Sequence, residues 1–242
     1  MQLDVSFIPN EAINRDDKCV IVLDILRASS TIIAAFEAGC RSVLPVPDVD
    51  EAREIKARNP HMILCGEREG LPPEGFDLGN SPAEYAGQTV KNQELILTTS
   101  NGTRAILIGG KNTRVFVGGF LNFTAVLDKA LSSGQDILIQ CAGNNKAFAL
   151  EDAFAAAMLV DAVNQRVCNL EIGDNARWTL YALKGMISGR EEIGNFEIET
   201  VLRNTAHGKH LITVGFSKDI SFCAQKDVSA TVPYLSSGKL II

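Results

Sequence analysis

Four short segments of the chain concentrate the side chains that could do chemistry. They begin at Asp24, Gly66, Thr98 and Cys141 and read DILRASST, GEREG, TTSNGTR and CAGNNKAFALED. Hydroxyl, amide and carboxylate groups stand in them beside glycines and cationic side chains. Arginine can bind two oxygens of a phosphate, carboxylate or sulfonate at once through parallel N–H donors. The segments therefore predict a receptor for a small anion.

Each polar segment follows a short apolar run, which predicts how the segment is positioned. The runs have the composition of buried strands and alternate with helix-length amphipathic stretches. We predict strands at 19–23, 61–65, 94–97, 114–117, 136–140 and 210–216, and helices at 30–39, 49–58, 103–110, 122–134, 149–164 and 175–187. This alternation is typical of a three-layer α/β fold, with a mostly parallel or mixed sheet and helices on both faces. Residues 227–242 are expected to form irregular chain or an edge strand.

The polar segments are expected to meet in space although they lie far apart in the sequence. Ligands of parallel sheets bind just outside the carboxyl ends of the strands, where loops lead into helix N-termini that favour anions. One such segment would be explained by helix caps and turns, but four in succession favour a binding site. The residues predicted to bind substrate are Ser29, Ser30, Arg68, Ser100, Asn101, Gly102, Thr103 and Gly143. Those predicted to take part in catalysis are Asp24, Arg27 and Arg104.

Carboxylates in or beside these segments predict a Mg²⁺ site. Mg²⁺ prefers oxygen ligands and commonly completes its coordination with water and substrate phosphate. The predicted ligands are Asp24, Glu67, Asp77, Glu151 and Asp152. The three histidines form no H-x₃-H pair, so the sequence disfavours zinc. For Asp24 the structural alternative is a salt bridge to Arg27 or a helix cap.

Common hydrolase signatures do not explain the segments. VLDILRASS begins like the D-x-D-x-T motif of aspartate-nucleophile phosphatases, but Leu26 replaces the second aspartate. Neither Cys65 nor Cys141 begins a C-x₅-R loop, and the sequence has no G-x₄-G-K-[ST] or G-x-S-x-G motif. We expect both cysteines to be structural. The nucleophile stays open between a metal-bound water and the Asp24 carboxylate.

Composition limits the classes of partner and compartment. The chain has 242 residues, is 46% hydrophobic and 21% charged, and carries a net charge of −6 without a basic run, so extended nucleic-acid binding is not expected. We find no signal peptide and no apolar stretch long enough to span a membrane. Six scattered cysteines without a C-x-x-C pair fit a reduced, cytoplasmic protein. One domain over 1–242 is expected, with a subdivision near 165–210 as the alternative, and a homodimer is compatible with the sequence.

Five stretches in a fixed order carry a resemblance to a known family. They are VIVLDILRASSTI, CGEREGLPPEGFDLGNSP, LTTSNGTRA, QCAGN followed by FALED, and GFSKDISFCAQKD followed by VPYL. In them the chain resembles 2-phosphosulfolactate phosphatase, a Mg²⁺-dependent acid phosphatase family associated with coenzyme M biosynthesis. The resemblance covers about residues 1 to 240.

The resemblance implies hydrolysis of 2-phospho-3-sulfolactate to 3-sulfolactate and phosphate. That substrate carries a phosphate, a carboxylate and a sulfonate, which gives the predicted anion-binding segments three groups to hold. Two alternatives keep the same segments. One is a phosphatase for another small phosphorylated hydroxy acid, and the other is a non-catalytic protein that binds phosphorylated metabolites.

Overall fold

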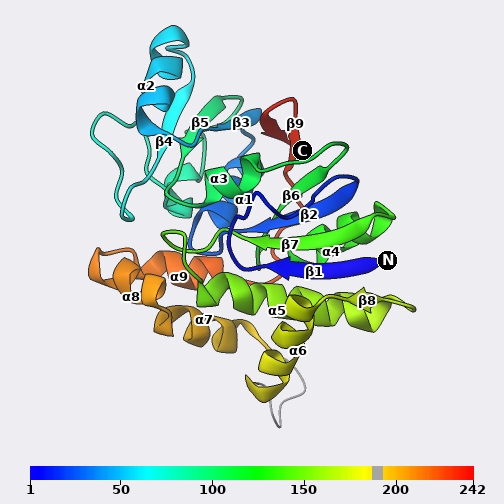
Figure 1. Ribbon diagram of the computed structural model, residues 1–242. Coiled ribbons are helices and arrows are strands. Elements are labelled where there is room, and N and C mark those ends of the chain that lie inside the picture. The colour runs from blue at the N-terminus through cyan, green and yellow to red at the C-terminus, as the bar shows by residue number, and fades with distance from the viewer. Residues whose placement is uncertain (187–192) are drawn as a thin grey trace.

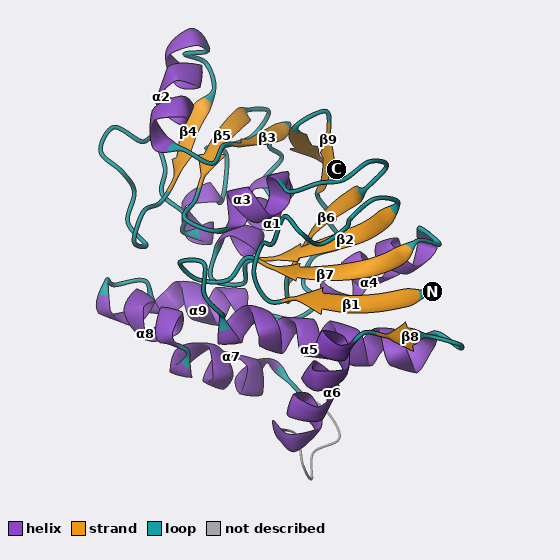
Figure 2. Cartoon of the chain, viewed as in Figure 1, coloured by secondary structure: helices purple, strands orange, loops and turns teal. Residues whose placement is uncertain are grey.

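The computed structural model describes residues 1–186 and 193–242, and within them ten strands form one mixed sheet (Figures 1 and 2). The strand order is β4-β5-β3-β10-β9-β6-β2-β7-β1-β8. The strands are β1 Gln2–Ser6, β2 Lys18–Leu23, β3 Ser42–Pro45, β4 Ile63–Gly66, β5 Glu94–Thr98, β6 Arg114–Gly118, β7 Asp136–Cys141, β8 Glu171–Ile172, β9 Tyr234–Ser236 and β10 Lys239–Ile241.

The sheet contains two groups of parallel strands joined by a hairpin. β6, β2, β7, β1 and β8 pair in parallel on one side, and β3, β5 and β4 pair in parallel on the other. The hairpin of β9 and β10 lies between them and is antiparallel to both of its neighbours. The C-terminal segment is therefore inside the sheet, and the expectation that it forms irregular chain or an edge strand is wrong for β9 and β10.

Helices cover both faces of the sheet, which confirms the predicted three-layer α/β fold (Figure 2). The helices are α1 Ala28–Glu37, α2 Val49–Arg58, α3 Gly102–Leu107, α4 Phe123–Ser132, α5 Leu150–Arg166, α6 Asp174–Met186, α7 Asn195–Asn204, α8 Ala206–Thr213 and α9 Ser217–Cys223, with a short 3₁₀ helix η1 at Pro82–Tyr85. Residue 187, the last of the predicted helix 175–187, lies outside the described residues.

The central strand β2 shows why its sequence is apolar throughout. Ile21 points into a core shared with Phe154 of α5, whereas Val22 points into a second core shared with Phe36 of α1. Successive side chains of a strand point to opposite faces, so a strand with helices on both sides must be hydrophobic at every position. This arrangement holds the end of β2, where the first polar segment begins, rigidly in the centre of the molecule.

The predicted strand at 210–216 is wrong, because the helix α8 occupies most of it. Only Leu211 of that stretch is fully buried, which is too little for a strand inside the sheet. Thr205 caps the start of the helix by accepting the N–H of Gly208. Gly215, at a φ of +94°, ends it with the N–H of Phe216 donating back to Leu211, the pattern of a Schellman motif. These caps outweigh the β-branched residues of the segment.

The helices α5 to α9 form one layer beside β1 (Figure 1). α6 packs on α5, and α7, α8 and α9 contact one another. In the described part of the chain no helix is both long and apolar enough to cross a membrane. This layer matters for the site, because α8 and α9 each contribute an ionisable side chain to it.

Candidate active site

The structure brings the four polar segments together. The backbone N–H of Ser100 donates to Glu67 at 2.8 Å, joining the segments after β5 and β4. The N–H of Asn145 donates to the side-chain oxygen of Asn101 at 3.0 Å, joining the segments after β7 and β5. A Cβ atom added to Gly102 would lie 2.6 Å from Asp24 Oδ2, so the segment after β5 also abuts the one after β2.

The sequence led us to expect that the four polar segments meet because they lie at one edge of a parallel sheet. The strand directions show a different cause. Three antiparallel pairings separate β3 from β6, so the two parallel groups have opposite directions along the ladder. Contacts between the loops after β2, β4, β5 and β7 require strong rotation of one group against the other. Adjacent strands twist by roughly 20–25°, and two-stranded ribbons twist more, which makes the hairpin the natural place for this rotation.

Asp24 is the buried centre of the site. It follows β2 directly, and only 8% of its surface is exposed. Its Oδ1 accepts the N–H of Ala28 at the start of α1 (3.1 Å), while its own N–H donates to Ser29 Oγ (2.9 Å). Gly102 leaves the room that Oδ2 occupies. Asp24 thus supplies an acceptor to the first residue of α1, although the N-cap residue itself is Arg27. This contact uses only one oxygen of the carboxylate.

Glu67 and Glu151 approach Asp24 from the ends of other elements. Glu67, after β4, accepts the N–H of Gly70 (2.9 Å) as well as the N–H and hydroxyl of Ser100. Glu151, in the first turn of α5, lies 3.3 Å from the imidazole of His207. Both glutamates act electrostatically on Asp24. Three of the five predicted metal ligands therefore lie near enough to influence one another.

Asp152 and Asp77 occupy different positions. Asp152 is buried, and its two oxygens accept the N–H groups of Ile25 (2.9 Å) and Gly143 (3.0 Å), so it links the loops after β2 and β7. The structure does not bring Asp77 to this group. Its carboxylate accepts from Lys56 on α2 and from the N–H of Leu64, both at 2.8 Å. Burial alone would raise the Asp77 pKa, but these two donors hold it below its usual value.

Burial raises the pKa of Asp24 to about 6, with the negative charges of Glu67 and Glu151 adding to the effect and His207 opposing it. It also raises the pKa of Asp152 well above its usual value. His207 lies on α8. Burial alone would lower its pKa, but the Glu151 hydrogen bond and the surrounding carboxylates outweigh burial and raise it. Sequence reasoning missed His207 because it considered the three histidines only as zinc ligands. The only available signal was that one of just three histidines precedes a glycine.

The site offers few protein ligands for Mg²⁺, so water and substrate phosphate would have to supply the others. Among residues 1–186 and 193–242, no three His, Cys, Asp or Glu side chains are arranged to hold a metal ion by themselves. Mg²⁺ usually retains several waters and needs one or two carboxylates together with substrate phosphate. Asp24, with Oδ2 not engaged by a backbone donor, and Glu151 meet that smaller requirement.

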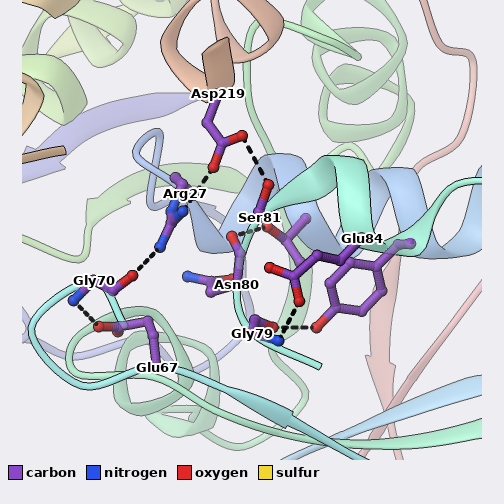
Figure 3. Close-up of polar contacts among 10 residues, drawn as sticks. Arg27, Glu67, Gly70, Gly79, Asn80, Ser81, Glu84 and Asp219 are labelled. Atoms are coloured by element: carbon purple, nitrogen blue, oxygen red, sulfur yellow. Dashed lines mark hydrogen bonds and ion pairs between the residues drawn. The ribbon is translucent and has the colours of Figure 1, made fainter. Parts of the chain in front are cut away.

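Arg27 pairs with Asp219 of α9, not with Asp24 (Figure 3). Its Nη1 lies 2.6 Å from Asp219 Oδ2, its Nη2 donates to the Gly70 carbonyl at 2.7 Å, and the guanidinium lies over the Phe216 ring. Asp219 Oδ1 also accepts the Ser81 hydroxyl at 2.8 Å. Arg27 is 2% exposed. The buried network ties the loop after β2 to the loop after β4, to η1 and to α9, and sequence reasoning had assigned no role to Asp219.

Three other side chains predicted to bind substrate are buried or half-buried. Ser30 is fully buried, and its hydroxyl lies beside the Cys223 thiol. Thr103 is also buried and exchanges hydrogen bonds with Thr99. Arg68 is half-buried and donates to the Glu67 carbonyl and the Thr98 hydroxyl. Thr103 and Arg68 therefore hold their loops in shape.

Arg104 is exposed and lines a cavity of about 600 Å³ next to the buried carboxylates. The cavity is lined by Ile8, Pro9, Asn10, Glu11, Ser100, Asn101, Arg104, Ile108, Ala142, Asn145 and Lys146. A larger cavity of about 850 Å³ lies between β6, α4 and the C-terminal hairpin, and it shares no residue with the polar loops. Because Ser100, Asn101 and Asn145 of the polar segments line the cavity of about 600 Å³, it is the opening next to the site.

Cys65 is the residue before the last one of β4, Cys141 is the last residue of β7, and both are completely buried. Burial raises the Cys65 pKa to about 12 and raises the Cys141 pKa well above its usual value. A thiol is a weak nucleophile until it ionises. Because both thiols are buried and their pKa values are raised, neither cysteine is suited to act as a nucleophile.

Comparison with known proteins identifies the group to which this arrangement belongs. The sequence profile of a family described as 2-phosphosulpholactate phosphatase matches residues 6–238. The chain belongs to the 2-phosphosulfolactate phosphatase family. A probable 2-phosphosulfolactate phosphatase of Thermotoga petrophila is 38% identical over 225 residues, covering 93% of this chain and 92% of the relative. Proteins given the same name in Pseudothermotoga lettingae and Clostridium acetobutylicum are 38% and 36% identical, covering 99% and 93% of this chain and 98% and 92% of their own lengths.

The stretch that matches the 2-phosphosulfolactate phosphatase family contains every residue of the site. The matched residues 6–238 include the four polar segments, His207 of α8 and Asp219 of α9. The resemblance found in the sequence is confirmed at the level of the family. The roles of individual residues rest on the geometry above.

Proposed function

We propose that the chain hydrolyses 2-phospho-3-sulfolactate to 3-sulfolactate and phosphate with the help of Mg²⁺. The observation that carries the proposal is the convergence of Asp24, Glu67 and Glu151 with the Ser100–Gly102 loop. Ser100 and Asn101 of that loop line a cavity. Relatives that align with more than nine-tenths of the chain bear the name of that activity. In a family member, buried acids beside an opening favour turnover over simple anion binding, because a pure anion receptor gains nothing from added negative charge.

A cation is needed because the substrate is itself strongly anionic. Asp24, Glu67 and Glu151 would repel a phosphate group inside a poorly solvated site. Asp24 and Glu151 are the residues that would hold Mg²⁺. Bound there, the ion would neutralise the charge on the phosphoryl oxygens in the ground state and the transition state.

The protein's own groups have separate tasks. Asp24 either orients the attacking water or attacks phosphorus itself, and both roles require its ionised form. Glu67 fixes the Ser100–Gly102 loop through its hydrogen bonds to Ser100. Asp152 fixes the loop after β7 through the N–H of Gly143. The loops around Asp24 are thus held in place before the substrate arrives, as positioning in catalysis requires.

The test is phosphate release from a panel of small phosphorylated hydroxy acids by protein depleted of metal with EDTA. We expect no turnover without metal and recovery on addition of Mg²⁺, with 2-phospho-3-sulfolactate as the best substrate. Full activity after exhaustive chelation would refute the metal assignment. If the protein prefers a different acid, it is a phosphatase with another substrate. If it binds these acids without turnover, it is a receptor for phosphorylated metabolites.

A further inference from the structure

Two cationic side chains from different elements line the cavity beside the carboxylates. Arg104 belongs to α3, and Lys146 lies in the loop after β7. Within residues 1–186 and 193–242 neither side chain makes an ion pair or a hydrogen bond. The cavity contains one acidic side chain, Glu11, which acts electrostatically on Arg15. The lining therefore carries a net positive charge, in contrast to the acidic interior next to it.

The backbone holds Lys146 at the cavity in an uncommon conformation. Asn144 and Ala147 exchange backbone hydrogen bonds of 2.9 Å in both directions, which closes a two-residue hairpin loop. Its central residues, Asn145 and Lys146, have φ values of +50° and +63°. Such turns require positive φ at both positions, and glycine normally fills the second. A lysine here gives up a backbone preference that a glycine would satisfy, which points to a use for its side chain.

The tip of this turn is fixed against the segment that carries Arg104. The N–H of Asn145 donates to Asn101 Oδ1 at 3.0 Å, and Asn101 lies directly before α3. Two residues that line the cavity also contact the segments around Asp24. Ala142 lines the cavity, and its N–H donates to the carbonyl of Leu23, the residue before Asp24. Ser100 lines it too and bonds Glu67. A small molecule with its phosphate near Asp24 would extend toward the two cations.

We propose that this cavity binds the acid groups at the non-phosphorylated end of the substrate, with Lys146 contacting the sulfonate and Arg104 the carboxylate. The inference rests on the proposed function and adds the residues that set specificity. Arg104 suits a planar carboxylate, which accepts two parallel bonds from a guanidinium. Lys146 offers a compact charge to the three oxygens of a sulfonate.

The test uses two substrates that differ by one group. 2-Phospho-3-sulfolactate carries both acids, whereas 2-phospholactate has the carboxylate and lacks the sulfonate. Lys146→Gly removes the cation and suits the positive φ of the turn. We expect it to lower kcat/KM for the sulfonated substrate by about tenfold to a hundredfold, mainly through KM, as for one charge-assisted contact. For 2-phospholactate the change should stay within about threefold.

Three further variants separate the roles. Arg104→Gln should lower kcat/KM for both substrates, because both carry the carboxylate. Lys146→Arg should retain most of the preference for the sulfonate. Lys129→Ala removes an exposed lysine of α4 that lines no part of this cavity, and it should leave both substrates unaffected. Equal losses on both substrates in Lys146→Gly, or no loss on either, would overturn the assignment of Lys146.

Binding separates failure of the inference from failure of the proposed function. Calorimetric titration with 3-sulfolactate and with lactate needs no turnover. If the protein releases no phosphate from either substrate, the proposed function fails. The cavity assignment then stands if 3-sulfolactate binds more tightly than lactate and Lys146→Gly removes the difference. It falls if the two ligands bind equally or the variant leaves the difference intact.

Discussion

Arg27 and Asp219 form a buried ion pair between residues 192 positions apart in the sequence, with 2.6 Å between Nη1 and Oδ2. The side chains are 1% and 6% exposed. The pair lies where the loop after β2 meets α9, and Arg27 also donates to the carbonyl of Gly70 beside Glu67 (Figure 3). The guanidinium expected to grip the substrate is thus engaged by the protein, and its substitution should act on the fold as well as on the site.

We predict that Arg27→Ala lowers the free energy of unfolding by about 3–5 kcal/mol, since it leaves the Asp219 carboxylate buried and unpaired. Urea denaturation measures the loss. Asp219→Ala in the same background should cost less than in the wild type, because the partner charge is already absent. Arg53→Ala is the control, since its ion pair with Asp50 is exposed and such pairs contribute at most about 1 kcal/mol. Additive losses would show that the pair is not coupled.

Gly102→Ala should impair catalysis through Asp24. The added Cβ would lie 2.6 Å from Asp24 Oδ2 and 2.8 Å from the Ala28 Cβ, so the carboxylate must move. Misplacement of a reacting group by about 1 Å can cost about a hundredfold in rate, and we expect kcat to fall at least about tenfold. Gly109→Ala is the matched control, because no atom lies within 4 Å of its added Cβ. Equal kcat values for the two variants would contradict this account.

Asp24→Asn should lower kcat by at least about a hundredfold, the scale of a catalytic group, while the variant remains folded. The amide retains the shape and the acceptor for the Ala28 N–H but loses the charge. Steady-state kinetics with saturating Mg²⁺, together with circular dichroism, is the measurement. Near-normal turnover would assign Asp24 to a structural role.

The same variant should change the pH dependence of stability in metal-free protein. Burial raises the Asp24 pKa from 3.8 to about 6. Its contribution to stability is therefore complete below pH about 4 and is lost as the pH rises through about 6. In EDTA, we expect Asp24→Asn to match the wild type near pH 4 and to exceed it by about 1–3 kcal/mol at pH 7.5. A difference that stays constant with pH, measured by urea unfolding, would refute the shifted pKa.

Cys65→Ser and Cys141→Ser should each retain kcat within about tenfold, less than the loss caused by removing a nucleophile. Both thiols are fully buried, and burial raises their pKa values. Iodoacetamide at pH 7.5 should modify the exposed Cys168 first, without loss of activity. Loss of several orders of magnitude in a folded variant would make one of these thiols part of the chemistry.

Local sequence was sufficient for five of the ten strands in the described residues, β2, β4, β5, β6 and β7, and for the four polar segments. The interiors of the runs that end at Leu23, Leu97 and Gln140 are apolar because helices cover both faces of the sheet, and this is visible in composition alone. The prediction of a strand at 210–216 failed, because a threonine cap and a glycine with positive φ favour a helix there despite the β-branched residues. The hairpin of β9 and β10 was missed as part of the sheet, because its strands of three residues carry little pattern.

The sequence by itself determined the α/β class, the family and the identity of the polar segments, because each depends on residue types and their order along the chain. Only the tertiary structure decided which charges meet. Arg27 takes Asp219 as its partner instead of the nearby Asp24, His207 joins Glu151, and Asp77 pairs with Lys56 away from the other carboxylates. Pairing of buried charges is set by the distance between atoms and by exclusion of water. Both quantities arise only when the strands and helices have packed.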